Sequence, residues 1–160
     1  MRYSVDIETA LYDWLVLRRG ISASAHKLPA TLGQGSVTSS ALVEMPDGYF
    51  FVMPDGKLIR VPIQIPALPH VHVVRTGGLT ADLVLEQNNV DFDVYAKAQG
   101  DAMAVALDLC GWVRELPQQQ VDFTCYSAEV SVLPYANPDP RHPTLARATF
   151  KALIGIRTKE

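Results

Sequence analysis

The sequence is poor in cysteine, with only Cys110 and Cys125 among 160 residues, and the two are not spaced as a C-x-x-C pair. We expect both to be reduced packing residues, although the sequence leaves a disulfide between them open. It also has no apolar run near the roughly 18 residues of a membrane span, so we expect a soluble protein that does not enter a membrane. The acidic residues Asp6, Glu8 and Asp13 near the start disfavour a secretory signal peptide.

An excess of basic charge is missing as well. The chain has 14 lysines and arginines against 17 aspartates and glutamates, a net charge of −3. This balance disfavours a nucleic-acid binder as a whole, while leaving a local basic patch open. Gly77-Gly78 is followed by neither a helix pattern nor Lys-Ser or Lys-Thr, so it is not a phosphate-binding loop.

Catalytic motifs are also lacking. No G-x-S-x-G element or comparable motif places a nucleophile beside a base, so we predict no catalytic residues, no cofactor and no enzymatic activity. His70 and His72 would share one face of a strand, a spacing that can chelate a metal. Because no cysteine pair or H-E-x-x-H helix supplies further ligands, we predict no metal site. A site formed by these histidines with Asp82 is the alternative.

Two helices are indicated by apolar residues at helical spacing. The first runs within Met1 to Gly20, where Gly20 can close the helix, and the second runs from about Asp101 to Leu116, before Pro117. The apolar stripes are Ile7, Ala10, Leu11, Trp14 and Leu15 in the first helix, and Ala102, Ala106, Leu109, Val113 and Leu116 in the second.

The segment between the first helix and the first strong strand pattern is unusual. Residues 21–48 are predicted to be an extended loop or arm, since Ile21 to Leu42 is rich in Ser, Ala, Thr and Gly without a sustained period. Residues 49–66 are predicted to be a projecting β-hairpin, from Tyr49 to Ile65, that turns at Pro54-Asp55-Gly56. Pro62 and Pro66 would confine its second arm to a sheet edge.

The rest of the chain predicts strands. Val71 to Arg75 leads up to Gly77-Gly78, residues 90–96 alternate between apolar and polar, and Ala146 to Ile156 is the longest strand pattern. Val121 to Cys125 and Glu129 to Leu133 are shorter candidates, and Asn137 to Pro140 reads as a turn. We therefore predict a single α/β (α+β) domain over 1–160, with two helices on one face of a mainly antiparallel sheet.

The second face of this sheet is predicted to be polar. Along the last strand Arg147, Thr149, Lys151 and Arg157 alternate with apolar residues. Because no third helix is predicted, this face must meet water or another subunit. A charged strand face is most often simply solvated, whereas long sheet edges offer sites for pairing between chains.

From Pro69 to Glu160 the chain resembles the tail-terminator proteins of long-tailed (siphovirus-like) bacteriophages, in particular those of phages that infect actinobacteria. The resemblance rests on Pro69-x-Val71-x-Val73-x-Arg75-x-Gly77-Gly78, on Asp91-x-Asp93-Val94-Tyr95-Ala96 before the second helix, and on the Pro138-Asp139-Pro140 turn before a closing strand. The helix from Asp6 also fits. The segment from Ile21 to Leu68 is longer than the family leads us to expect.

The resemblance implies a structural virion protein, assembled in the host cytoplasm and located at the head–tail junction. Such a protein forms a ring, typically a hexamer, on the tail-tube protein, stops tube growth, and presents a docking surface to a head-completion or stopper protein. DNA passes through the ring without specific binding, and heterologous contacts between subunits close the ring. The predicted subunit-interface residues are Arg75, Gly77, Gly78, Asp91, Asp93, Tyr95, Arg147, Lys151 and Arg157.

Three other functions remain open at this stage. Another neck component, such as a head-completion or connector protein, is the nearest, and the two predicted helices against a sheet favour the terminator over it. A tail-tube subunit would be a β-sandwich with a long hairpin, which the predicted hairpin keeps open. A small metal- or ligand-binding domain at His70 and His72 comes from a different class altogether.

Overall fold

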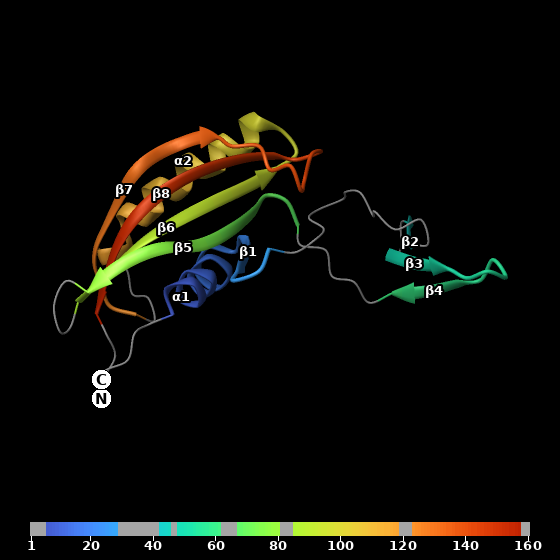
Figure 1. Cartoon of the computed structure of the whole chain (residues 1–160), viewed down its shortest axis with the longest axis horizontal. Helices are drawn as coiled ribbons and strands as arrows, with labels where there is room; N and C mark the ends of the chain where they lie inside the picture. The colour runs from blue at the N-terminus through green and yellow to red at the C-terminus, as the bar shows by residue number, and fades with distance from the viewer. Residues whose placement is uncertain are drawn as a thin grey trace.

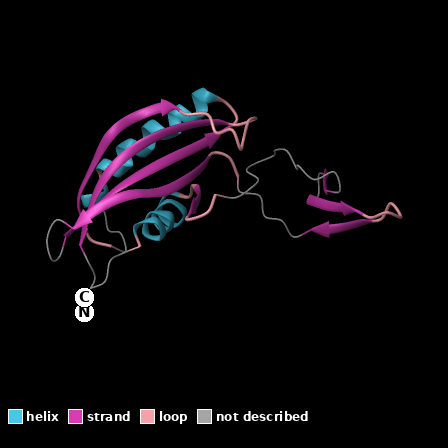
Figure 2. Ribbon diagram, in the orientation of Figure 1, coloured by secondary structure: helices cyan, strands magenta, loops and turns pink. Residues whose placement is uncertain are grey.

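The structure is a computed structural model that describes residues 6–28, 42–45, 48–61, 67–80, 85–118 and 123–157. Within these ranges it contains a five-stranded sheet in the order β1-β5-β6-β8-β7, a separate three-stranded sheet in the order β2-β3-β4, and two helical segments beside the larger sheet (Figures 1 and 2). The predicted α+β class is confirmed. None of the helices in these ranges has the length and apolarity that crossing a membrane requires.

The first helix begins at Ile7, after the predicted Asp6. It consists of α1 (Ile7–Asp13), continued by a π-helical turn η1 (Trp14–Arg18). The Asp6 carboxylate caps it by accepting a 3.3 Å hydrogen bond from the Thr9 amide, and Gly20 follows it with a φ of +65°. Residues 1–5 of the predicted helix lie outside the described residues.

Two strands lie within the predicted extended loop or arm over residues 21–48. Within residues 21–48, β1 (Ser22–Ala25) pairs in parallel with β5 (His70–Thr80) at the edge of the larger sheet, and β2 (Leu42–Met45) belongs to the smaller one. The sequence Ser-Ala-Ser-Ala lacks the apolar alternation by which a strand is recognised. Residues 29–41 of the predicted arm lie outside the described part of the chain.

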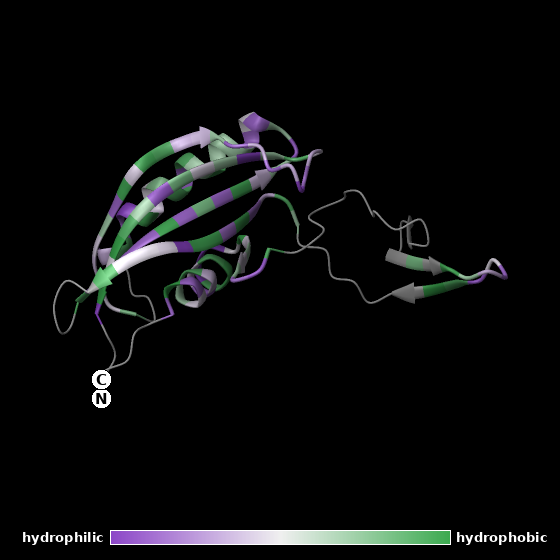
Figure 3. Cartoon of the chain, viewed as in Figure 1, coloured by the Kyte–Doolittle hydropathy of each residue, from purple (hydrophilic) through white to green (hydrophobic). Residues whose placement is uncertain are grey.

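The middle of the larger sheet follows the predicted pattern. β5, β6 (Leu85–Ala96) and β8 (Ala146–Arg157) are antiparallel neighbours, and apolar and polar residues alternate along β6 and β8 (Figure 3). Phe92 of β6 stands opposite Phe150 of β8, and their rings stack with centroids 4.7 Å apart. β5 continues past the predicted glycine pair to Thr80, with a bulge between Arg75 and Gly77.

The second helix connects β6 to the next strand in the sequence, which lies at the edge of the larger sheet. α2 (Gln99–Arg114) is followed by a 3₁₀ turn, η2 (Leu116–Gln118), which contains Pro117. All five residues of the predicted stripe are buried. They share one core with the apolar face of the sheet and with Ile7, Leu11, Trp14 and Leu15 of the first helix. Both helices therefore lie on one face of the sheet, as predicted.

The strand after α2 is a single element rather than two. β7 (Cys125–Ala136) covers both predicted segments from Cys125 onward and pairs with β8, with register shifts at three places. These irregularities break the period of two in the sequence and explain why one strand was predicted as two. Val121 lies outside the described residues.

The smaller sheet contains the predicted hairpin. β3 (Gly48–Val52) and β4 (Leu58–Val61) are antiparallel, and the Met53 amide donates to the Lys57 carbonyl across the predicted turn. β2 adds a third strand that the sequence did not predict. Figure 1 shows this sheet apart from the larger one. Residues 62–66, the end of the predicted hairpin, lie outside the described ranges.

Candidate assembly interface

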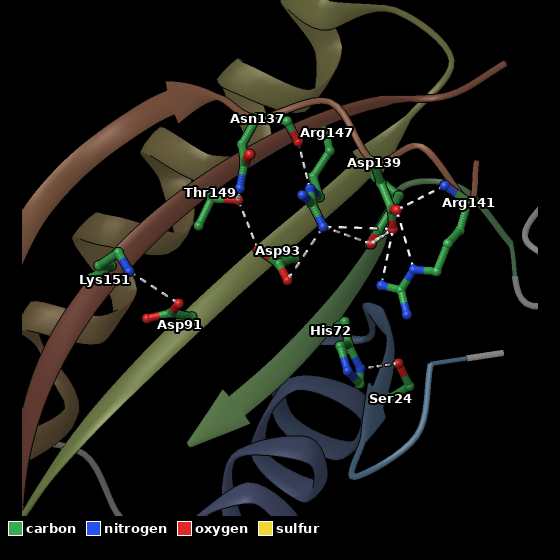
Figure 4. A network of polar contacts seen from close by, with 11 residues as sticks. Ser24, His72, Asp91, Asp93, Asn137, Asp139, Arg141, Arg147, Thr149 and Lys151 are labelled. Carbon is green, nitrogen blue, oxygen red and sulfur yellow. Dashed lines mark hydrogen bonds and ion pairs between the residues drawn. The ribbon is translucent and has the colours of Figure 1, made fainter. Parts of the chain in front are cut away.

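The face of the larger sheet opposite the helices carries a network of ion pairs and hydrogen bonds (Figure 4). Lys151 Nζ donates to Asp91 Oδ2 at 3.2 Å. Asp93 accepts a 2.7 Å bond from the Thr149 hydroxyl and lies 3.9 Å from Arg147 Nη1. The β6–β8 register places these residues opposite one another, because Asp91 faces Lys151 and Asp93 faces Thr149. Asp91, Asp93, Arg147 and Lys151 are thus paired within the chain.

Asp139 joins the connection between β7 and β8 to this network. Its carboxylate accepts a 2.7 Å hydrogen bond from the Tyr95 hydroxyl and lies 3.5 Å from Arg147 Nη1. Arg141 donates to it through its backbone amide and its guanidinium. Burial alone would raise the pKa of Asp139, but the hydrogen bonds from Arg141 and Tyr95 outweigh it and hold that pKa well below its usual range.

The hydrogen bond between Tyr95 and Asp139 also affects which side chains of this face are exposed. Tyr95 and His70 have no exposed surface, and His142 packs edge-on against the Tyr95 ring at 5.5 Å. Burial, followed by the hydrogen bond to Asp139, raises the pKa of Tyr95 to about 12. Tyr95 is therefore buried within its own chain.

His70 and His72 form a ladder with two serines of β1. Ser22 Oγ lies 2.7 Å from His70 Nδ1, Ser24 Oγ lies 2.9 Å from His70 Nε2, and Ser24 Oγ lies 2.8 Å from His72 Nδ1. Burial, together with the neighbouring His72, lowers the pKa of His70 to about 4. Both ring nitrogens of His70 and the Nδ1 of His72 are thus engaged by hydroxyls that fix β1 to β5.

No three His, Cys, Asp or Glu side chains are grouped to hold a metal ion in the part of the chain that the structure describes. Asp82, the third ligand of the alternative metal site, lies outside that part. Ser24 is hydrogen-bonded to two histidines, and the Asp93 carboxylate is engaged by Thr149. This arrangement fixes strands to one another.

The remaining predicted interface residues lie elsewhere on the sheet. The Arg75 amide donates to Glu8 Oε1 of the first helix at 2.6 Å, and Arg157 is exposed at the end of β8. Gly77 has a φ of +153° at the bulge of β5. A Cβ at Gly78 would collide with the Gln87 carbonyl oxygen of β6. Both glycines thus have a role within the sheet, and the interface prediction for all nine residues stays a prediction.

A surface that the sequence did not identify runs along β7. This strand is the last one in its sheet, and among the described strands nothing pairs with its outer edge. Four large apolar side chains on it are exposed, and Leu133 is the most exposed at 64%. These residues, which we call the β7 edge, are Tyr126, Val132, Leu133 and Tyr135. Exposed apolar side chains that gather on one strand make this strand a candidate binding surface.

A second apolar surface lies on the hairpin. Apolar side chains on both sides of its turn are exposed, and the exposed fraction of Ile59 is 52%. These residues, which we call the hairpin tip, are Val52, Met53, Leu58 and Ile59. The three strands of this sheet are short, with four or five residues each. The available signal in the sequence was the run of apolar residues on either side of Pro54-Asp55-Gly56.

Comparisons with known proteins do not identify the chain, because no protein-family model and no curated protein matches it. The indications of function are the two apolar surfaces, the paired polar face and the resemblance carried by the sequence motifs.

Proposed function

We propose that this chain is a tail-terminator subunit, which forms a closed ring on the end of a phage tail tube, stops tube growth and offers a docking surface to the head. The ring would contact the tail-tube protein on one side and a head-completion or stopper protein on the other. The motifs between Pro69 and Pro140 support the family, and the α+β architecture agrees with what that family implies.

The observation that carries the proposal is that one chain has two different exposed apolar strand surfaces, the β7 edge and the hairpin tip. A subunit that pairs one surface with an unlike surface on its neighbour makes a heterologous contact. Such contacts produce a closed ring if the rotation between subunits closes. Two unlike surfaces are therefore what a ring subunit requires.

The polar face of the larger sheet supports the same function in a different way. Its aspartates are held by Lys151, Thr149 and Arg147, so few charges are left unpaired there. A surface of balanced, internally paired charge offers little net attraction to the phosphates of DNA. It is thus suited to line or flank a passage through which DNA moves without being bound.

The test is electron microscopy of particles from a phage with a stop codon early in this gene. Tail length reports termination directly and does not depend on the fold. We expect filled heads together with abnormally long, unattached tubes. A phage with the stop codon suppressed in a permissive host is the control, and its tails should return to normal length.

Two other results would contradict the proposal. Tails of normal length beside filled, unjoined heads would place the protein on the head side of the junction, as a connector or stopper. Intact infectious particles would show that the protein is not needed for tail assembly at all.

A further inference from the structure

We propose that the hairpin tip of one subunit docks on the β7 edge of the next subunit, so that each copy contributes one half of every contact in the ring. This inference depends on the proposed ring and names the surfaces that close it. It places the contact on the apolar strands, away from the charged sheet face to which the sequence pattern had pointed.

The two surfaces have matching geometry. β4 is one of the two edge strands of the smaller sheet, and β7 is one of the two edge strands of the larger one. β4 has four residues, and so does Ser127–Val130, the stretch of β7 with an unbroken register that lies between Tyr126 and Val132 of the β7 edge. An exposed strand that adds to the edge of another sheet gains main-chain hydrogen bonds, and its flanking side chains supply specificity.

The apolar area is also adequate. Taking roughly 100 Å² for a fully exposed aliphatic side chain and roughly 200 Å² for an aromatic one, the β7 edge and the hairpin tip together expose on the order of 500 Å² of apolar surface. An interface of standard size buries about 1,600 Å² in total, of which about 900 Å² is apolar. The eight side chains supply more than half of that apolar part, and the adjoining strand backbone adds to it.

The occupant is a second copy of the chain because both halves of the contact are present in one sequence and neither is covered by a described part of its own chain. The larger sheet is already held by a continuous core. The smaller sheet has two edge strands and an exposed apolar tip, so it gains most from docking. The β7 edge is an extended apolar surface of the kind that such a hairpin needs.

The experiment uses two single substitutions in the full chain. Ile59→Glu places a charge on the hairpin tip and leaves the β7 edge intact, and Leu133→Glu does the reverse. Both positions are exposed, so each variant should fold, which circular dichroism will check. Leu107→Glu on α2, also at an exposed apolar position, is the matched control.

Oligomeric state is measured by light scattering after size exclusion. We expect the wild type and Leu107→Glu to form the ring, and each of the other variants to be monomeric at 17.6 kDa. An equimolar mixture of Ile59→Glu and Leu133→Glu should form a dimer with one copy of each and nothing larger. Only one intact tip and one intact β7 edge remain in that dimer to meet.

Two outcomes overturn the inference while leaving the proposed ring in place: a ring that survives either substitution, or two folded monomeric variants that do not combine in the mixture. A wild-type chain that stays monomeric at every concentration would overturn this inference and remove the physical support for the ring. The tail-length phenotype would then decide the terminator function separately.

Discussion

The ladder between β1 and β5 makes the stability of this protein sensitive to mild acid. His70 has no exposed surface, and serine hydroxyls lie within hydrogen-bond distance of both its ring nitrogens. Burial, together with the neighbouring His72, lowers its pKa from the ordinary value of 6.5 to about 4. In the unfolded chain the same imidazole takes up a proton near pH 6.5, so protons bind preferentially to the unfolded state between these two values.

The size of the effect follows from linkage. The stability that the neutral form provides is present above pH 6.5, declines as the pH falls, and is fully lost below the pKa of about 4 in the folded state. A difference of about 2.5 between the two pKa values is worth about 3 kcal/mol. Of this, about 2 kcal/mol should be lost between pH 7 and pH 5. Carboxylates contribute little in that interval, because their ordinary pKa values lie near 4.

The assay is urea unfolding of the wild type and of His70→Gln at pH 7, 6 and 5. At pH 7 the free energy of unfolding of the variant should be lower than that of the wild type, because a buried hydrogen-bonded ring is replaced. Between pH 7 and pH 5, however, the free energy of unfolding of the variant should fall by about 2 kcal/mol less than that of the wild type. The pKa of His72 is also lowered, mainly by burial, so the variant retains part of the pH dependence. Phe150→Leu, which weakens the core and keeps His70, is the control and should show the full wild-type dependence.

Equal losses of stability in the wild type and His70→Gln would refute the reasoning. That result would mean that His70 accepts its proton in the folded state as readily as in the unfolded chain.

Three further predictions concern residues that hold the sheet together. Asp139→Asn should lower the free energy of unfolding by about 3 kcal/mol, because it removes the buried carboxylate that lies 3.5 Å from Arg147 and accepts the Tyr95 hydroxyl, and urea unfolding at pH 7 measures this loss. Gly78→Ala should cost about 1 to 3 kcal/mol in the same assay, since its Cβ meets the Gln87 carbonyl, and an unchanged stability would contradict that close approach. Asp6→Ala removes the cap of α1 and should lower stability by about 1 kcal/mol, seen as a reduced melting temperature in circular dichroism.

Elements with a regular period could be predicted from the sequence. The stripe of α2 and the alternation of β8 repeat often enough to fix both the type of element and the face that is buried. The turn at Pro54-Asp55-Gly56 was predicted from local chemistry alone, and Gly56 takes the positive φ of +82° that such a turn favours.

The missed elements depend on partners far away in the chain. Ser22 and Ser24 become a strand because they meet histidines 48 residues further on, which no local pattern reveals. Asp139 reaches Tyr95 across 44 residues for the same reason. In β7 the bulges displace side chains from one face to the other, so its exposed apolar residues could not be assigned to a surface before the register was known.

The order of strands in the larger sheet affects how the chain reaches its fold. β8 follows β7 in the sequence but lies between β6 and β7 in space. Until β8 is inserted, β6 and β7 have no shared neighbour and the apolar side of α2 has only part of its sheet to pack on. Closing the sheet therefore waits for long-range pairing, which makes folding slow compared with a chain of local hairpins. It also means that β7 takes its place at the edge of the finished sheet only once β8 has paired with both neighbours.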